Sequence, residues 1–538
     1  MKRAAEDIPN SQFDWPEEED SPLVVASSVS PTEETTKAEM AESEAKAATR
    51  KPKIVAAVWL HALLGYASAL QVSALNPLSS FVQRFLNDSV AGSYGAPPTA
   101  SQLTWLWSLT STQFLVGAAL GALLFGSLGD RVGRKASLTV LKGAACVAGC
   151  LLQFLSVWWG RPEPLVLGRL LVGCATGLSM LLPLFLAECV PAGPRAAFLS
   201  TAPMLMRSVL AALGALHNLP LFLGREGLWP YSFLVPVPLA LGHMASSFWL
   251  HDSPKHLYIT MGREAEARAA FHFYQGGEAG WSKQKAAYDA EKALDDKRAE
   301  RRRVGLLGVW RRRHQRWPFL LCLVAGLNAT LGGIAIASLY STEQLIELGL
   351  EEGQAAAFTA LFVVAPSILI EAGLVICRVM ERVGRRPFYL LGSTLGILTT
   401  FLIFLSGQLG QGGVGAALGV LSLAMAFWAY ALGPGYVVGV LPSEIAPQSS
   451  RAITGAVSWS VSWAASVFLG LAYPPAFALI GSFAALPITA LSALCTLFLF
   501  LYLPESRRRP VEELAGLWLR KKKNTVKTAA ERVHLEKF

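Results

Sequence analysis

The sequence predicts an all-α membrane protein with twelve transmembrane helices arranged as two six-helix bundles. Only 16% of its 538 residues are charged, whereas soluble proteins carry about 25%. The hydrophobic residues, 53% of the chain, are gathered in continuous blocks of about 20 residues, which is the length a helix needs to cross ~30 Å of hydrocarbon. A charged motif also recurs in the two halves of the chain, which indicates a duplicated unit.

The apolar blocks define five parts of the chain. Residues 1–53 are polar and acidic with no visible signal peptide, so we expect a disordered cytoplasmic tail. Residues 54–250 form the N-terminal bundle, 251–316 a cytoplasmic helical linker, 317–503 the C-terminal bundle and 504–538 a basic cytoplasmic tail. The expected spans are 54–77, 103–127, 136–158, 164–189, 196–223, 229–250, 317–341, 355–377, 387–407, 413–441, 452–473 and 476–503.

The distribution of lysine and arginine orients the chain. If the N-terminus is cytoplasmic, 41 of the 47 basic residues are cytoplasmic, and positive residues are normally retained on that side. Three lie outside, namely Arg84, Arg161 and Arg225, and three lie within the membrane, namely Lys142, Arg169 and Arg207. Both termini are therefore expected in the cytoplasm. The formal charge of +9 is explained by this topology and by the lipid bilayer as partner, and it requires no nucleic acid.

The internal repeat contains matched acids and bases at the cytoplasmic side. The loop Gly129–Lys135 and the loop Met380–Arg386 share an acid–Arg–Val–Gly–Arg–basic core, and the second copy lies 251 residues after the first. Two helices further on, Glu188 and Arg195 are seven residues apart, as are Glu444 and Arg451. Such pairs can close the cytoplasmic side of a transporter in one state and release it in another. The predicted gate residues are Arg131, Arg134, Glu188, Arg195, Glu381, Arg385, Arg386, Glu444 and Arg451.

These motifs resemble the sugar-porter branch of the major facilitator superfamily, and in particular the animal facilitative glucose transporters. The resemblance covers roughly residues 54–514, and its matching stretches are Leu106–Leu109, Gly129–Lys135, Leu167–Arg169, Leu228–Pro230, Asp252–Lys255, Tyr340–Thr342, Glu381–Arg386, Gly433–Gly435 and Leu503–Ser506. It implies facilitated diffusion of a hexose or related polyol by alternating access, at a site between the two bundles, in the plasma membrane.

The same resemblance breaks down at the positions where the family binds sugar. Most of the family's amide and tryptophan positions hold other residues here: Pro203, Ala329, Thr330, Ala335, Leu369, Gly439, Ser462 and Ser466. A hexose offers several hydroxyls, and each buried hydroxyl without a partner costs a few kcal/mol. The sequence therefore leaves three functions open: a carrier of a hexose or similar solute, a sensor that does not transport, and a carrier of an organic ion.

Some polar residues remain on helices that should face the cavity. The candidates for contact with a small solute are Gln71, Asn76, Arg207, Asn328, Thr330, Ser462 and Trp463. The alternative for the uncharged ones is hydrogen bonding between helices, which is common for Asn and Ser in membranes. Trp463 lies 12 residues past Arg451, about 18 Å deep, where an interfacial tryptophan would not be expected.

Two intramembrane charges are not supplied by the family resemblance. Arg207 lies 12 residues past Arg195, about 18 Å into the membrane, and Glu371 lies ten residues before Glu381, about 15 Å in from the same side. Charges at this depth usually face a cavity or each other. We hypothesise that they approach each other across the cavity, where they could bind a zwitterionic or anionic solute or latch one state. The alternative is separate water or backbone partners.

Three further expectations follow from the sequence. No nucleotide loop, metal cluster or nucleophile–base pair is visible, so we expect neither an enzyme nor a cofactor. The triplet Asn87-Asp88-Ser89 lies in the first outside loop and predicts N-glycosylation, whereas Asn328-Ala329-Thr330 lies within a membrane helix. The first span, 54–77, contains no Asp or Glu, which favours uniport over proton coupling. The sequence does not indicate an oligomeric state.

Overall fold

The computed structural model describes residues 60–61, 63–179, 181–189, 194–275, 280–289, 306–311, 313–376, 383–410, 413–446 and 448–506. Residue contacts divide the chain into Met1–Pro52 and Lys53–Phe538. The first unit lies outside the described residues, as does most of the predicted C-terminal tail. Across the described ranges the structure is helical and no strand is present, which confirms the predicted all-α class.

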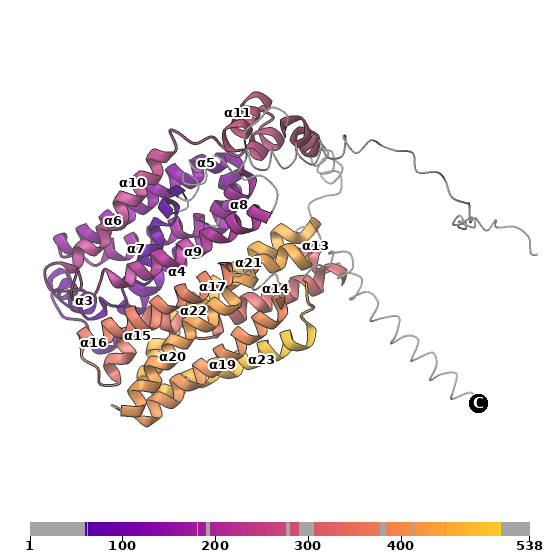
Figure 1. The fold of residues 1–538 in the computed structure, drawn as a ribbon. Helices are drawn as coiled ribbons and strands as arrows, with labels where there is room; N and C mark the ends of the chain where they lie inside the picture. The colour runs from indigo at the N-terminus through magenta and orange to yellow at the C-terminus, as the bar shows by residue number, and fades with distance from the viewer. Residues whose placement is uncertain are drawn as a thin grey trace, which may run out of the picture. The chain divides into compact units, whose positions relative to one another are not determined.

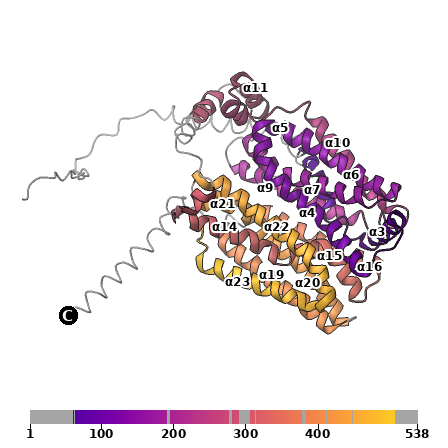
Figure 2. The ribbon, with the colours of Figure 1, turned by 180° about the vertical axis from the view of Figure 1, so that it is seen from behind.

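The N-terminal bundle contains helices α3 (Ser79–Tyr94), α4 (Ala100–Arg131), α5 (Arg134–Ala136), α6 (Lys142–Trp159), α7 (Glu163–Leu178), α8 (Leu181–Cys189), α9 (Pro194–Leu216) and α10 (Pro236–Ser246). The C-terminal bundle contains α14 (Arg313–Leu331), α15 (Ile334–Glu347), α16 (Glu352–Phe358), α17 (Ala365–Ile376), α19 (Arg385–Leu409), α20 (Gly413–Leu432), α21 (Pro434–Ile445), α22 (Gln448–Ile480) and α23 (Ala485–Tyr502). Figures 1 and 2 show these two sets of helices lying side by side.

Several predicted spans are interrupted rather than continuous. The span 164–189 is divided between α7 and α8, and the seventh span is divided between α14 and α15 at Gly333, whose φ is +90°. Helix α22 continues through Pro474 and Pro475, so the break before the last span falls at Gly481–Ala484 rather than at the prolines. In the described ranges, seven helices are long and apolar enough to span a membrane by length and composition.

The first span departs most from a regular α-helix. It contains a 3₁₀ segment, Ala67–Gln71, followed by turns up to Leu78. Backbone groups released inside a membrane must find other partners. Side chains from neighbouring helices supply them: Lys142 donates to the Gly65 carbonyl, and Asn218 Nδ2 donates to the Ala74 carbonyl at 3.0 Å.

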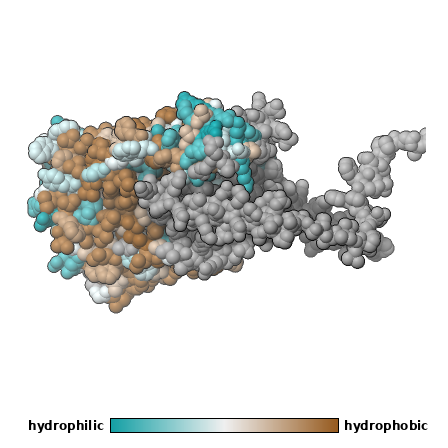
Figure 3. Space-filling model, turned by 45° about the horizontal axis from the view of Figure 1, so that its top comes forward, coloured by the Kyte–Doolittle hydropathy of each residue, from teal (hydrophilic) through white to brown (hydrophobic). Residues whose placement is uncertain are grey.

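Small residues allow the helices of one bundle to pack closely. Gly117 and Gly121 on α4 face α7, and a Cβ atom at Gly117 would lie 2.0 Å from the Leu170 carbonyl oxygen. Such contacts are typical of helix association in membranes, where burial of apolar surface against lipid supplies little driving force. The outward faces retain large apolar side chains, including Leu398, Phe401, Leu494 and Phe500, and Figure 3 shows hydrophobic residues over much of the face that it draws.

The two bundles meet along two helix pairs. Helix α4 packs on α22, and α9 packs on α17. The second pair is the one that carries Arg207 and Glu371, so the expected adjacency of the fifth and eighth spans is present. Part of the predicted linker folds into short helices, including α11 (Glu264–Tyr274), whose Phe271 packs against Trp281 with ring centroids 5.5 Å apart.

Candidate functional site: a cavity between the two bundles

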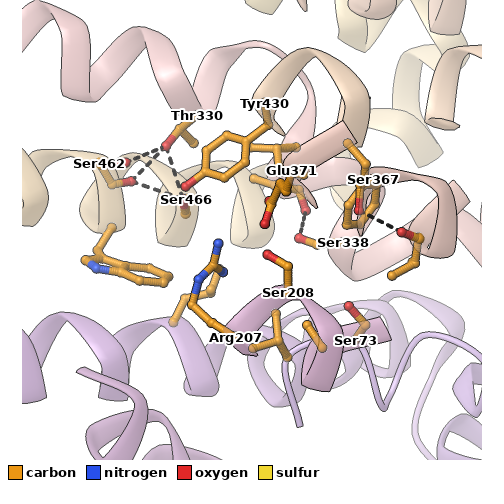
Figure 4. Close-up of a pocket in the computed structure, with 18 of the residues that line it drawn as sticks. Ser73, Arg207, Ser208, Thr330, Ser338, Ser367, Glu371, Tyr430, Ser462 and Ser466 are labelled. Atoms are coloured by element: carbon orange, nitrogen blue, oxygen red, sulfur yellow. Dashed lines mark hydrogen bonds between the residues drawn. The ribbon is translucent and has the colours of Figure 1, made fainter. Parts of the chain in front are cut away.

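A cavity of about 120 Å³ lies between the bundles. This is room for several water molecules or part of a small solute. Its walls come from both halves of the chain, chiefly from α9, α15, α17, α20 and α22 (Figure 4). Its lining residues are Val72, Ser73, Leu115, Arg207, Ser208, Ala211, Thr330, Ile334, Ala335, Ser338, Val364, Ser367, Glu371, Phe427, Tyr430, Trp459, Ser462, Trp463 and Ser466.

Arg207 and Glu371 both line this cavity from opposite bundles. Figure 4 shows the guanidinium and the carboxylate pointing into the same space, with the Ser208 hydroxyl directed toward Glu371. No ion pair joins these two described side chains, so the space between them is not closed by direct contact. Both charges therefore line one cavity from opposite bundles, and their approach to each other across it, rather than separate water or backbone partners, stays a hypothesis.

A cluster of hydroxyls forms the neighbouring wall. Thr330 Oγ1 lies 3.0 Å from Ser462 Oγ and 3.3 Å from Ser466 Oγ, and it donates to the Ser462 carbonyl at 3.1 Å. The indole nitrogen of Trp463 is buried and has no acceptor in the described structure. These groups can exchange hydrogen bonds with a hydroxylated solute, and the indole ring supplies an apolar face.

Three of the predicted cavity residues do not line it. Asn328 is 2% exposed and donates to Ser393 at 3.2 Å and Thr496 at 3.1 Å, inside the C-terminal bundle. Gln71 is fully buried in the N-terminal bundle, and its side-chain amide has no partner in the described structure. Asn76 lies nearer the outer end. For Asn328, the alternative of hydrogen bonding between helices is what the geometry supports.

Asn76 takes part in the contact that joins the two bundles at their outer ends. Its Nδ2 donates to Ser341 Oγ at 2.6 Å and to the Ala337 carbonyl at 3.1 Å, and its Oδ1 accepts from the Thr342 amide at 2.9 Å. Beside it, Glu343 accepts hydrogen bonds from Trp107 and Gln83 of the other bundle, at 3.0 and 3.1 Å. These bonds join the two bundles at this end of the cavity.

The repeated motifs form two matched networks at the side for which the sequence predicts a cytoplasmic location. In the first, Arg134 pairs with Glu188, which also accepts from Ser253 Oγ at 2.5 Å. In the second, Arg385 Nη2 lies 2.9 Å from Glu444, which also accepts from Ser506 Oγ at 2.5 Å.

Two further acids complete these networks, and the sequence reasoning assigned them no role. Asp252 accepts from the Lys135 amide at 3.2 Å, and Glu505 accepts from the amides of Arg385 and Arg386 at 3.0 and 3.1 Å. A usable signal was present, because Asp252-Ser253 and Glu505-Ser506 are 253 residues apart, close to the offset of the other repeated motifs. Each acid thus binds backbone amides in the first turn of a candidate membrane span, Arg134–Trp159 or Arg385–Leu409.

The remaining predicted gate residues are less fully described. The Arg386 guanidinium donates to the Phe500 carbonyl at 2.7 Å rather than to Glu444. The side chains of Arg131, Arg195 and Arg451 are not among those described, and Glu381 lies outside the described residues.

The two other cations at membrane depth are buried without a carboxylate. Arg169 is 1% exposed, donates to the carbonyls of Gln71 and Ser111 at 3.0 and 3.4 Å, and lies over the Phe114 ring. Lys142 is 2% exposed and bonds to Gly65, as described above. The cations at this depth therefore stabilise the irregular first span instead of forming ion pairs.

Two bundles around a central cavity, with matched charge networks at one face, define a carrier of the alternating-access class. The comparisons with known proteins agree. Residues 53–518 match the sequence model of the family described as "Sugar (and other) transporter", and the chain belongs to this family. The proteins it matches are transporters and not enzymes.

Among relatives, the chain is 26% identical over 447 residues to facilitated glucose transporter member 3 of solute carrier family 2 from Ovis aries, covering 82% of this chain and 87% of the relative. It is 27% identical over 468 residues to member 9 from Mus musculus, covering 86% and 84%. Among solved structures it is similar in fold to the inward-open xylose transporter XylE from E. coli, with a TM-score of 0.67, 20% identity, and coverage of 87% of this chain and 99% of that one.

Proposed function

We propose that the protein moves a small hydroxylated solute, in the class of a hexose or polyol, across the membrane by facilitated diffusion. The observation that carries this proposal is the cavity between the bundles, whose hydroxyls come from both halves of the chain and whose indoles come from α22. Thr330 and Ser462 lie where hydrogen bonds to solute hydroxyls can form, and Trp463 offers both a ring face and a free N–H. The relatives named as glucose transporters support the same class.

Alternating access requires that contacts at the two ends of the cavity form and break in turn. The outer contact is formed by Asn76 and Glu343, each of which bonds to residues of the opposite bundle. The networks of Glu188 and Glu444 lie at the cytoplasmic side, each within its own bundle. We propose that these networks form the cytoplasmic gate, and that the orientation of the membrane protein is the one with both termini in the cytoplasm, at the plasma membrane.

Uptake by purified protein in proteoliposomes tests the proposal. Labelled hexoses and polyols should equilibrate across the vesicle membrane, with and without a proton gradient, and excess unlabelled solute should compete. If the purified protein moves none of these solutes and no organic ion, the result would instead favour the hypothesis of a sensor that does not transport. Uptake only in the presence of a proton gradient would contradict facilitated diffusion.

A further inference from the structure

The cavity contains an arginine that a neutral sugar does not require. We infer that the preferred solute is a hydroxylated compound that also carries a carboxylate, and that Arg207 binds this carboxylate. This inference rests on the proposed function, because it names the chemical class of solute that the same cavity takes. Two features of Arg207, its lack of a partner and its surroundings, carry the argument.

Arg207 is available to a ligand. It is on α9, its side chain lines the cavity, and it makes no hydrogen bond or ion pair in the described structure. A cation at membrane depth is costly unless it is paired or hydrated. The planar guanidinium presents paired N–H donors that match the two oxygens of a carboxylate. A carboxylate arriving in the cavity therefore finds a partner whose geometry suits it.

Glu371 attracts Arg207 electrostatically across the cavity but forms no ion pair with it among the described contacts. It projects from α17 on the opposite bundle and is not joined to Arg207 by an ion pair, while the Ser208 hydroxyl points toward it (Figure 4). Its remaining oxygen can accept a hydrogen bond from a hydroxyl of the solute. The cavity thus presents the paired N–H donors of Arg207 on one wall and the accepting carboxylate of Glu371 on the other, and the solute would bind between them.

The surrounding charge favours an anion. At membrane depth, the described part of the N-terminal bundle contains the cations Lys142, Arg169 and Arg207, whereas none of its described acids, which include Glu163 and Glu188, lines the cavity. Glu188 is already paired with Arg134. Lys142 and Arg169 are not among the residues that line the cavity, so the wall on this bundle owes its positive charge to Arg207. A positive wall raises the local concentration of anionic solutes.

The hydroxyl groups make a simple carboxylic acid a poorer match than a sugar acid. Ser73, Ser338 and Ser367 line the cavity in addition to Thr330 and Ser462. Ser338 and Ser367 already donate to helix carbonyls, whereas the buried Ser73 hydroxyl has no partner among the described residues. Hydroxyls on the solute can add hydrogen bonds to these groups, and an aliphatic chain cannot. A hexuronate or an aldonate supplies both the carboxylate and the hydroxyls.

The experiment compares D-glucuronate, D-gluconate, D-glucose and D-glucosamine in proteoliposomes, and measures the shift of the melting temperature of the purified protein with each. We expect the two acids to be taken up at least about tenfold faster than glucose at equal concentration. Arg207→Gln should reduce uptake of the acids by about tenfold or more, since charge-assisted hydrogen bonds are the strong ones, while uptake of glucose changes little. Arg207→Lys should fall between the two proteins, and Glu371→Gln should retain uptake of the acids.

Arg225→Gln is the matched control, because Arg225 is an exposed arginine of an outside loop and should leave every rate unchanged. The melting temperatures of the variants without solute report on folding. Equal uptake of acids and glucose, with Arg207→Gln lowering both equally, would overturn the inference and leave the proposed function standing. If no solute is taken up, but glucuronate raises the melting temperature of the native protein and not of Arg207→Gln, the proposed function fails and the binding role of Arg207 stands. If neither uptake nor a shift is seen, both fail.

Discussion

The indole nitrogen of Trp107 donates a hydrogen bond to Glu343 at 3.0 Å, and this bond joins the two bundles at the outer end of the cavity. Gln83 donates to the other carboxylate oxygen at 3.1 Å. A buried carboxylate that accepts two bonds is well satisfied, whereas one that loses them is costly to keep buried. The same contact must break whenever the cavity opens outward, so its strength sets part of the balance between the two states.

Replacing Trp107 with Phe should therefore favour the outward-open state, because the ring volume is largely retained while the hydrogen bond is lost. A cysteine introduced at Ser338, which lines the cavity, would report this shift by reacting faster with a membrane-impermeant thiol reagent added from outside. The comparable change Trp158→Phe, at an exposed tryptophan, is the control. An unchanged labelling rate in Trp107→Phe would show that the bond does not contribute to closure.

Breaking a cytoplasmic network should shift the conformational balance in the opposite direction, toward the inward-open state. Glu444 bonds to both Arg385 and Ser506, so Glu444→Ala leaves two groups without their acceptor and should favour the inward-open state. Labelling of cytoplasmic-side cysteines should become faster, while exposed-site controls such as Glu266→Ala leave it unchanged. If labelling in Glu444→Ala matches that of the native protein, this network is an anchor for the helix end rather than a gate.

The turn before α19 offers a test of stability. Gly384 has a φ of +118°, and a Cβ atom there would lie 2.6 Å from Glu505. Both the backbone strain and the displaced carboxylate should make Gly384→Ala destabilising, by about 1–3 kcal/mol. The expected result is a lower melting temperature of the purified protein, with Gly92→Ala, a helical position with open space around it, as the control. A melting temperature equal to that of the control would contradict the role given to this turn.

The charged networks and the membrane depth of Arg207 and Glu371 could be predicted from the sequence, because both depend only on the spacing of residues along the chain. The spacing of Glu444 and Arg451 matched that of Glu188 and Arg195, and the structure does place an arginine of each loop against Glu188 and Glu444. Likewise, counting residues from the cytoplasmic end put Arg207 and Glu371 at similar depth, and both line the cavity.

Residue spacing could not predict which face of each helix points toward the cavity. A position can be assigned to a face only if the helix is regular, and the first span becomes a 3₁₀ segment and then turns, which places Gln71 within its own bundle and Asn76 at the outer contact. Glu343 was missed because it follows the predicted end of the seventh span at residue 341, where an acid is expected to face water. The structure buries it against the opposite bundle instead.

N-glycosylation remains a prediction that concerns Asn87. Its side chain is half-buried on α3, and its Nδ2 lies 3.2 Å from Asp88. We expect Asn87→Gln to abolish the glycosidase-sensitive shift in gel mobility, because the second acceptor triplet contains Asn328, which is buried among Ser393 and Thr496. Asn328 is not a useful control because it is structural, so the conservative change Asp88→Asn, which retains the acceptor triplet, serves instead. A shift that persists in Asn87→Gln would contradict the proposed orientation of the chain.

The surroundings of Arg169 bear on whether transport is coupled to protons. This buried guanidinium bonds to the carbonyls of Gln71 and Ser111, and the described part of the first span places no carboxylate beside it. Without an acid there to take up and release a proton, we expect uptake to proceed by uniport and to be unaffected when a proton gradient is dissipated at constant voltage.

Uniport has a further consequence if the solute is an anion, because each transport event then moves one negative charge. An inside-positive potential of 100 mV favours an entering monoanion by about 2.3 kcal/mol, so its accumulation at equilibrium should rise about 50-fold. The accumulation of glucose, which is neutral, should not respond to the same potential and is the internal control. Accumulation of glucuronate that follows the proton gradient, and not the potential, would show that a proton accompanies the solute and would contradict uniport.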